Sequence, residues 1–288
     1  MLSVLIPAYD FNCRPLVEAL SCQADALGTE CEILVANDAS PRFQDEIRSV
    51  SCLPHVRYKE MEVNQGRSRI RNLLADEARY PYLVFIDGDA QVLDENFLRR
   101  YADRCRPGCC VLGGIAYDDV LPDEACRLHW TYGRHRESRM RERKVFTPFN
   151  FLIDKNLFNR IRFDEGIEGY GYEDAVFGAR LKEVAEVVYV RNPLLHAGLN
   201  DTPSYLERTR QACRTLRSLS SRYSSGYLSS LSRLWRFYGL ARRLRLDGLA
   251  AACFRRMAPV MERQLSGNHP SMFLFDLYKL GCLCADGR

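Results

Sequence analysis

The amino-acid sequence predicts an α/β fold, in which a mostly parallel central sheet is flanked by helices and followed by a helical appendage. Between residues 3 and 190, short runs of apolar and β-branched residues alternate with segments of helical periodicity. Several of these runs are apolar at every position, as expected of strands covered on both faces of a parallel sheet. From residue 204 onward the periodicity is helical throughout.

The first 115 residues predict alternating strands and helices. The expected strands are residues 3–6, 33–36, 56–59, 83–86 and 111–115, and the expected helices are 16–27, 44–50, 66–78 and 95–104. Strand, helix and strand in this order imply parallel βαβ units with right-handed crossovers. Such sheets bind ligands beyond the carboxyl ends of their strands, so we expect functional residues directly after each strand.

The alternation weakens after residue 117. Residues 126–145 are rich in arginine and predict a helix or a mobile segment, and short strands are expected at 149–153 and 187–190. Breaks near 224–226, 247–248 and 267–270 divide the C-terminal region into four expected helices. We therefore expect one domain at residues 1–203 and a basic amphipathic helical region at 204–288.

Composition and charge narrow the class of protein. The chain has 288 residues, of which 47% are hydrophobic and 27% are charged, and this composition excludes a disordered or fibrous protein. The formal net charge of +4 conceals a net −6 over residues 1–204 and a net +10 over residues 205–288. This asymmetry predicts contact with an anionic partner.

Targeting signals are missing from the sequence. The first ten residues lack a basic segment and are interrupted by Pro7 and Asp10, unlike a signal peptide, and no apolar run is long enough for a transmembrane helix. Twelve cysteines without a C-x-x-C pair indicate reduced thiols that act as small hydrophobic residues. We expect a cytoplasmic protein, either free or peripheral on the inner face of the cell membrane.

Carboxylates follow three of the expected strands. Tyr9 and Asp10 follow residues 3–6, Asp38 follows 33–36, and Asp87-Gly88-Asp89 follows 83–86. No G-x-G-x-x-G follows an early strand, which argues against NAD or FAD binding. In an extended segment, residues i and i+2 project to the same side, so Asp87 and Asp89 can present oxygens to one Mg²⁺ or Mn²⁺ ion. A simple D-G-D turn is the alternative interpretation.

Five segments together resemble the inverting family-2 glycosyltransferases, which have the Rossmann-like GT-A fold. The segments are S-V-L-I-P-A-Y-D (3–10), I-L-V-A-N-D-A-S (33–40), N-Q-G-R-S-R-I-R-N (64–72), F-I-D-G-D-A (85–90) and G-Y-G-Y-E-D (169–174). The resemblance spans about the first 200 residues. It implies transfer of a monosaccharide from a nucleotide diphosphate sugar, a UDP-sugar above all, to a hydroxyl of a glycan or lipid-linked acceptor in cell-surface polysaccharide synthesis.

The same resemblance implies roles for the donor-side residues. It assigns nucleotide binding to Pro7, Tyr9, Asp10, Asp38, Arg71, Asp87 and Gly88. It assigns the Mn²⁺ or Mg²⁺ ion to Asp89, Asp87 and His196. Arg67 and Arg69 stay undecided, because arginines on an exposed helix face are ordinary. Ala39 stands where the family commonly has a glycine, which raises the question of the turn's shape.

On the acceptor side, the resemblance implies that Asp174 is the general base. Glu173, Tyr170, Tyr172 and Asn150 are the implied acceptor-binding residues. The two acids of the E-D pair also favour the positive end of the helix expected at 173–183. The two tyrosine rings either stack on a sugar or pack inward, and the sequence favours neither arrangement.

Two other functions are compatible with the same carboxylates. A nucleotidyltransferase that makes nucleotide sugars would need a glycine-rich phosphate loop after the first strand, where Pro7 and Ala8 stand instead. A non-catalytic sugar-nucleotide-binding protein on the same frame is the other alternative. For residues 205–288, three interpretations stay open: packing on the catalytic domain, peripheral contact with an anionic membrane, or another partner. No nucleic-acid-binding signature occurs there.

Overall fold

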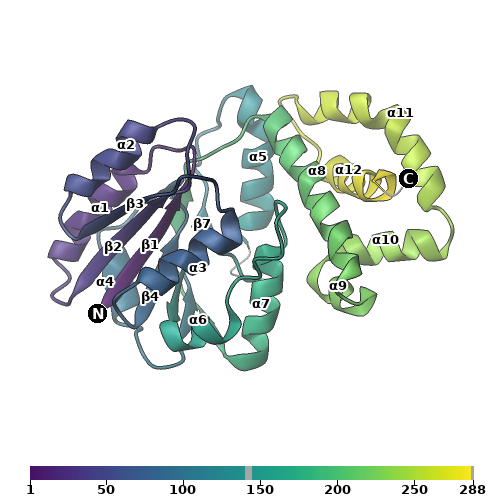
Figure 1. Ribbon diagram of the computed structural model, residues 1–288. Coiled ribbons are helices and arrows are strands. Elements are labelled where there is room, and N and C mark those ends of the chain that lie inside the picture. The colour runs from purple at the N-terminus through teal and green to yellow at the C-terminus, as the bar shows by residue number, and fades with distance from the viewer. Residues whose placement is uncertain (140–144, 287–288) are drawn as a thin grey trace. The chain divides into compact units, whose positions relative to one another are not determined.

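The computed structural model describes residues 1–139 and 145–286, which form two compact units (Figure 1). The sheet unit comprises residues 1–118, 136–166 and 173–198, and the helical unit comprises 119–135, 167–172 and 199–288. Two earlier segments thus join the C-terminal helices. The domain boundary expected between residues 203 and 204 stays a prediction.

A seven-stranded mixed sheet forms the centre of the sheet unit, in the order β3-β2-β1-β4-β8-β6-β9. Its strands are β1 (Leu2–Ala8), β2 (Cys31–Asn37), β3 (Val56–Glu60), β4 (Tyr82–Ile86), β6 (Cys110–Leu112), β8 (Asn150–Asp154) and β9 (Val187–Tyr189). Only β8 runs antiparallel to its neighbours, β4 and β6. The predicted α/β class with a mostly parallel sheet is confirmed.

The helices of the sheet unit cover both faces of this sheet. They are α1 (Arg14–Asp25), α2 (Gln44–Arg48), α3 (Arg67–Glu77), α4 (Phe97–Ala102), α6 (Lys155–Ile161) and α7 (Glu173–Val184). Side chains of α3, α6 and α7 share one core cluster with β1, β2, β4 and β8. Helices α1 and α4 pack together behind the sheet (Figure 1).

Aromatic side chains fill the core between β4, β8, α6 and α7. Phe85 stacks on Phe151 and Phe158 with ring centroids 4.8 and 5.1 Å apart, and Phe163 stacks on Phe177 at 4.2 Å. Each of these buried rings contributes about 1.5–3 kcal/mol through the removal of its apolar surface from water. This core holds β4 and α7 together; Asp87 follows the end of β4, and α7 begins at Glu173.

A second, three-stranded sheet was not predicted. It consists of β5 (Ala90–Gln91), β10 (Leu194–His196) and β7 (Ile115–Ala116), in the order β5-β10-β7. Strands of two or three residues are too short to show a periodicity. The single strand predicted at 111–115 is wrong, because Gly113 and Gly114 separate β6 from β7: a Cβ at Gly113 would lie 2.2 Å from Asn150 Oδ1, and Gly114 has a φ of 97°.

The helical unit contains α5 (Arg127–Tyr132), α8 (Thr202–Ser218), α9 (Ser225–Leu231), α10 (Arg233–Arg243), α11 (Asp247–Leu265) and α12 (Met272–Ala285). The described part of the Arg-rich segment forms α5 and a π-helical turn at Gly133–Glu137, and residues 140–144 lie outside the described residues. Five α-helices follow residue 199 up to residue 286, so the prediction of four was wrong. The extra break lies at Ser232, whose hydroxyl accepts a hydrogen bond from the Trp235 N–H at 3.4 Å and caps α10.

Candidate functional site

The carboxyl ends of β1, β2 and β4 meet at one edge of the sheet. The Asp38 N–H donates to the Ala8 carbonyl oxygen at 2.9 Å, which joins the ends of β2 and β1. A Cβ at Gly88 would lie 2.9 Å from the Pro7 carbonyl oxygen, so the backbone after β4 passes directly against the end of β1. The structure therefore brings together the predicted residues of segments 7–10, 37–40 and 87–89.

Asp38 is buried and holds the start of α3. Its carboxylate accepts hydrogen bonds from the backbone N–H groups of Gln65 at 2.6 Å and Gly66 at 3.2 Å. Burial raises the pKa of Asp38, and these two hydrogen bonds oppose the rise. Gly66 is the N-cap of α3, and its N–H has no partner within the helix. Asp38 accepts a hydrogen bond from this group and another from the preceding residue, and it thereby fixes the start of α3 at the sheet edge.

Tyr9 and Asp10 lie at the rim. The Tyr9 side chain is half exposed. The Asp10 carboxylate accepts two hydrogen bonds from Arg42, at 2.9 and 2.7 Å, and its backbone N–H donates to the Ser40 hydroxyl. Ala39 has a φ of 56°, so the left-handed turn for which a glycine is favoured forms with alanine, at a cost of about 1–2 kcal/mol.

Arg71 points inward from α3 and forms an ion pair with Asp87. Its guanidinium group also donates to the Arg67 carbonyl oxygen at 3.1 Å and lies over the Phe163 ring, and its buried Nε has no partner among the described residues. Burial raises the pKa of Asp87, the positive charge of Arg71 opposes this rise, and the negative charge of Asp89 adds to it. Arg71 thus offsets one of two closely placed negative charges.

Asp89 is held by His196. The imidazole Nε2 lies 3.1 Å from Asp89 Oδ2, and its Nδ1 lies 2.8 Å from the Tyr117 hydroxyl, which also bonds to the Glu137 carboxylate. Burial raises the pKa of Asp89, but the charge and hydrogen bond of His196 outweigh this effect, so that the pKa of Asp89 is lowered. Asp89, in turn, raises the pKa of His196 against the effect of burial.

The small sheet positions this pair. His196 in β10 is paired with Ala90 in β5, and the Ala197 N–H donates to the Asp89 carbonyl oxygen at 3.0 Å. A Cβ at Gly198 would lie 2.6 Å from Asp89 Oδ2, so a larger residue would displace the carboxylate. Residues 107 positions apart in the sequence therefore meet because β5 and β10 pair.

Glu173 and Asp174 open α7 beside the same group of charges. The buried Glu173 carboxylate lies 3.5 Å from the Arg67 guanidinium through Oε1, and its Oε2 has no hydrogen-bond partner among the described residues. Asp174 accepts a hydrogen bond from the Ala175 N–H at 2.7 Å. Burial, followed by the negative charge of Glu173, raises the pKa of Asp174 to about 7.

Arg67, which the sequence left undecided, lies among the acids of this site, and so do Tyr117 and Glu137, which the sequence did not identify. The Arg67 charge lowers the pKa values of Asp87, Asp89 and Asp174 against the effect of burial. Arg67 and Arg71 are four residues apart and therefore lie on one face of α3. This spacing could have indicated that Arg67 belongs to the same site as Arg71. No local pattern marks Tyr117 or Glu137, because they reach His196 from distant parts of the chain.

The structure gives three of the predicted acceptor residues other contacts. Tyr170 and Tyr172 belong to the helical unit, where the Arg208 guanidinium lies 5.7 Å from the Tyr170 ring and the Tyr172 hydroxyl lies 3.4 Å from that of Ser232. Asn150 is fully buried, and its amide bonds to the Tyr101 hydroxyl and the Gly114 carbonyl oxygen. In this placement Asn150 joins β8 to the Gly113–Gly114 break and offers no surface to an acceptor.

Residues 3–165 match the family model described as "Glycosyl transferase family 2". No curated protein sequence matches the chain. Among solved structures, mannosyltransferase PcManGT from Pyrobaculum calidifontis, in complex with GDP-Man and Mn²⁺, is 13% identical with a TM-score of 0.60, over 99% of this chain and 85% of that chain. S. aureus TarS 1–349 in complex with UDP-GlcNAc is 16% identical with a TM-score of 0.53, over 96% of this chain and 89% of that chain. These similarities establish a shared fold.

Proposed function

Since the chain belongs to glycosyl transferase family 2 and has the GT-A fold, we propose that it transfers a monosaccharide with inversion to a hydroxyl of a glycan or lipid-linked acceptor. The observation that carries this proposal is the grouping of Asp38 and the Asp87, Asp89 and His196 cluster beyond the carboxyl ends of the strands, with Asp174 at the start of α7 sharing the charges of Arg67 and Arg71. Cell-surface polysaccharide synthesis is the process in which such a transfer would serve.

The donor that we propose is a nucleotide diphosphate sugar, with UDP favoured. Asp38 would accept a hydrogen bond from a base N–H such as that of uracil, and the exposed Tyr9 ring would lie against the base. Pro7 and Gly88 form the close-packed backbone beneath, while Asp10 lies at the rim and Arg71 holds Asp87. The UDP-GlcNAc complex of TarS and the GDP-Man complex of PcManGT support a donor of this class.

We propose that Asp89, His196 and Asp87 hold a divalent cation, Mn²⁺ or Mg²⁺. Two carboxylates and an imidazole are suitable ligands for such an ion. A bound cation would also offset the repulsion between the negative charges of Asp87 and Asp89. When bound, the cation would neutralise charge on the departing nucleotide diphosphate. The Mn²⁺ complex of PcManGT supports this assignment.

Asp174 is the proposed general base. Its carboxylate would take the proton of the acceptor hydroxyl while that oxygen attacks the anomeric carbon from the face opposite the departing diphosphate. One bond forms as the other breaks, so the sugar inverts without a protein nucleophile. Glu173 would lie beside the acceptor, and a pKa of about 7 for Asp174 keeps a large fraction of the base ionised at neutral pH.

The Asp174→Asn variant tests the proposal. We expect transfer to fall by roughly 10²–10⁴-fold while UDP binding stays unchanged, because the amide cannot accept the proton. Asp45→Asn is the matched control, since Asp45 also lies in the first turn of a helix but is exposed and belongs to none of the hydrogen bonds and ion pairs described above for the site. Near-normal transfer by Asp174→Asn would refute the base assignment.

The two alternative functions give different outcomes in the same preparation. A nucleotidyltransferase would release diphosphate from a nucleoside triphosphate and a sugar phosphate. A non-catalytic binding protein would retain UDP affinity without transfer to any acceptor. Release of UDP from a UDP-sugar in the presence of Mn²⁺, lost in Asp174→Asn, would support the glycosyltransferase over both.

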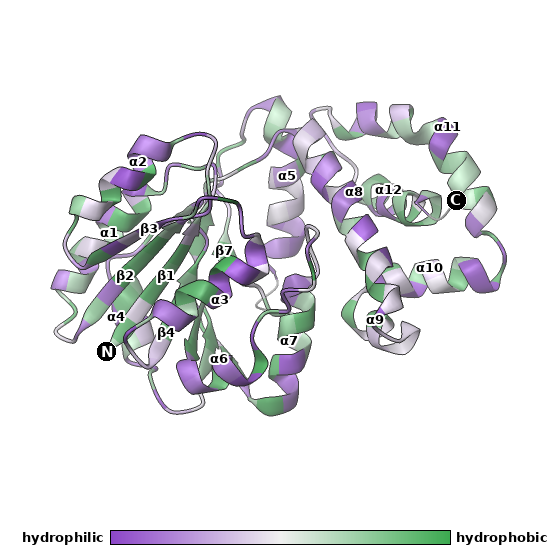
Figure 2. Cartoon of the chain, in the orientation of Figure 1, coloured by the Kyte–Doolittle hydropathy of each residue, from purple (hydrophilic) through white to green (hydrophobic). Residues whose placement is uncertain are grey.

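We further propose that the helical unit makes peripheral contact with an anionic membrane. No described helix is long and apolar enough to cross a bilayer. An apolar stripe nevertheless lies exposed along α10, α11 and their connection, and it consists of Phe237, Leu240, Leu244, Leu249, Met257 and Val260. Phe237 and Leu240 are three residues apart and share a face of α10, and Met257 and Val260 are likewise three residues apart and share a face of α11. Figure 2 shows hydrophilic and hydrophobic residues alternating along both helices.

Exposed arginines flank the apolar stripe. They are Arg233, Arg236, Arg243, Arg245, Arg255 and Arg256. Each basic residue near an anionic lipid surface contributes about 1 kcal/mol of attraction. The buried residues Leu216, Leu228 and Trp235 pack inside the helical unit instead, so the stripe is a separate surface. Its chemistry fits the shallow insertion of an amphipathic helix.

A further inference from the structure

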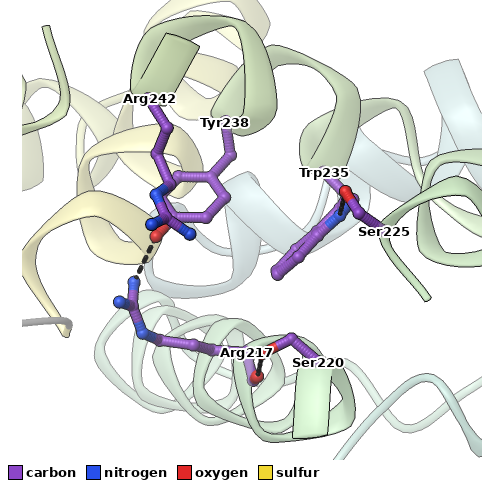
Figure 3. A pocket seen from close by; sticks show the side chains of 6 residues that line it. All are labelled: Arg217, Ser220, Ser225, Trp235, Tyr238 and Arg242. Atoms are coloured by element: carbon purple, nitrogen blue, oxygen red, sulfur yellow. Dashed lines mark hydrogen bonds between the residues drawn. The ribbon is translucent and has the colours of Figure 1, made fainter. Parts of the chain in front are cut away.

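A cavity of about 270 Å³ lies within the helical unit (Figure 3). It is bounded by the end of α8 and the turn after it, the start of α9, and one side of α10. The lining residues are Arg217, Ser220, Ser225, Trp235, Tyr238 and Arg242. None of these residues takes part in the proposed sugar transfer. The volume is near the lower end for small-molecule sites. It suits a small ligand, such as a phosphate group that carries a few additional non-hydrogen atoms.

Two guanidinium groups lie at the Tyr238 ring. Those of Arg217 and Arg242 are 5.4 and 5.9 Å from the ring centroid. Arg217 also donates to the Tyr238 hydroxyl at 2.8 Å and to the Leu283 carbonyl oxygen at 2.9 Å through Nη1, which fixes its position. Two like charges held beside one ring repel each other, and an anion between them would relieve that repulsion.

Neither guanidinium is neutralised by a bound carboxylate. Over residues 1–139 and 145–286, no Asp or Glu side chain forms an ion pair or a hydrogen bond with Arg217 or Arg242. Asp286 is the acid whose charge interacts with Arg217, and burial raises the pKa of Asp286 against the opposing influence of Arg214 and Arg217. The cavity therefore keeps a positive potential.

Hydroxyl and aromatic groups complete the lining. The Ser225 hydroxyl oxygen accepts the Trp235 indole N–H at 3.1 Å, so its own O–H remains as a donor toward the cavity. The Ser220 hydroxyl donates to the Arg217 carbonyl oxygen at 2.7 Å, which leaves its oxygen as an acceptor. The side chains of Trp235 and Tyr238 are only 5% and 3% exposed, so they form a rigid wall of the cavity. A sugar or polyol can pack against this wall.

We propose that this cavity binds the phosphate group of a sugar or polyol phosphate ester. Guanidinium groups recognise phosphate through charge-assisted, bidentate hydrogen bonds, and Arg217 and Arg242 retain N–H groups for them. Ser225 adds a neutral donor, and the Trp235 wall accepts the carbon face of the ester's sugar or polyol. Such an ester comes either from a soluble metabolite or from a phospholipid headgroup at the membrane surface.

Isothermal titration calorimetry on the full chain tests the soluble source. Glycerol 3-phosphate, glucose 1-phosphate and inorganic phosphate are titrated without divalent cations, so that the carboxylate cluster of the sheet unit contributes little binding. We expect the two esters to bind more tightly than inorganic phosphate, and glycerol and glucose to show no binding. Arg242→Gln should weaken ester binding by about tenfold, since a charge-assisted hydrogen bond is lost.

Arg263→Gln is the matched control, because Arg263 is an exposed arginine of the same helical unit that neither lines the cavity nor flanks the apolar stripe. Equal losses in Arg242→Gln and Arg263→Gln would overturn the proposal, as would the absence of binding to both esters and vesicles. Sedimentation with phosphatidylglycerol vesicles tests the lipid source: a larger loss for Arg242→Gln than for Arg263→Gln supports it. Sugar transfer plays no part in these measurements, so they are independent of the proposed reaction.

Discussion

At the scale of single residues, Asp174 is under opposing electrostatic influences. Burial and the charge of Glu173 raise its pKa to about 7, whereas the Ala175 N–H, Arg67 and Arg71 act to lower it. A carboxyl group with this pKa changes its protonation state within the neutral range. A general base is effective when its pKa lies near the working pH, so the environment suits the proposed role.

The pH dependence of transfer follows from this raised pKa. Because only the ionised carboxylate accepts a proton, we expect kcat/KM to rise with pH through about 7 and to level off above it. Glu173→Gln removes a neighbouring negative charge and should shift the rise to lower pH. A pH profile of initial rates for both proteins measures this. A profile that is flat between about pH 6 and 8 would contradict the prediction.

Gly198 tests the placement of Asp89. A Cβ at this position would lie 2.6 Å from the Asp89 carboxylate and push it away from His196. We expect Gly198→Ala to weaken Mn²⁺ binding by roughly 10–100-fold, the usual cost of disturbing groups that orient metal ligands. Calorimetric titration of Mn²⁺ in the presence of UDP measures the affinity. Gly239→Ala is the control, since a Cβ there meets no atom within 4 Å.

At the scale of elements, helix boundaries were harder to predict from the sequence than strands. The strands expected at residues 3–6, 33–36 and 83–86 lie within β1, β2 and β4, because each is a nearly continuous apolar run. The division between α9 and α10 was missed, since each of the expected breaks at 224–226, 247–248 and 267–270 contains a glycine. Ser232 ends one helix and caps the next through its hydroxyl, and serine is common enough that its presence alone predicts little.

Ser232→Ala tests the importance of this cap. Loss of the hydrogen bond to the Trp235 N–H should destabilise the helical unit by about 1 kcal/mol. The expected decrease in Tm is about 2–4 °C, measured by circular dichroism. Ser230→Ala is a suitable control because its exposed hydroxyl bonds only to the Tyr227 carbonyl oxygen within the same helix. Equal decreases in Tm for both variants would argue against the capping role.

At the scale of the whole molecule, opposite charges are separated along the chain. Residues 1–204 carry a net −6 and residues 205–288 a net +10. In the sheet unit, the negative charges include the Asp87 and Asp89 pair, whose proximity favours a bound cation. In the helical unit, arginines flank the exposed apolar stripe and line the cavity at Tyr238, so we propose two distinct anionic contacts there.

Vesicle sedimentation tests the membrane contact. We expect the full chain to bind phosphatidylglycerol vesicles, and binding to weaken as salt is raised because the charges are screened. Phe237→Gln combined with Leu249→Gln should reduce the affinity by at least about tenfold through the loss of apolar burial. Leu93→Gln is the control, as Leu93 is also an exposed leucine but belongs to the sheet unit. Equal binding to uncharged vesicles would disprove the electrostatic part.

The sequence by itself determined the α/β class, most strands of the large sheet and the acids at the strand ends. These features are local: apolar runs specify strands, and the carboxyl ends of neighbouring parallel strands must meet at one edge. Only the tertiary structure decided how the acids are partnered. Arg71 turns inward to Asp87, and His196 reaches Asp89 because strands of two and three residues pair across 107 positions.

The same limit applies to residues that gained or lost a place in the site. Arg67, Tyr117 and Glu137 entered it through contacts between distant segments, and the amide of the buried Asn150 bonds to Tyr101 and Gly114. The cavity at Tyr238 likewise requires two helices and a turn to come together. Contacts of this kind depend on packing and burial in three dimensions, whereas periodicity and spacing report only on neighbours along the chain.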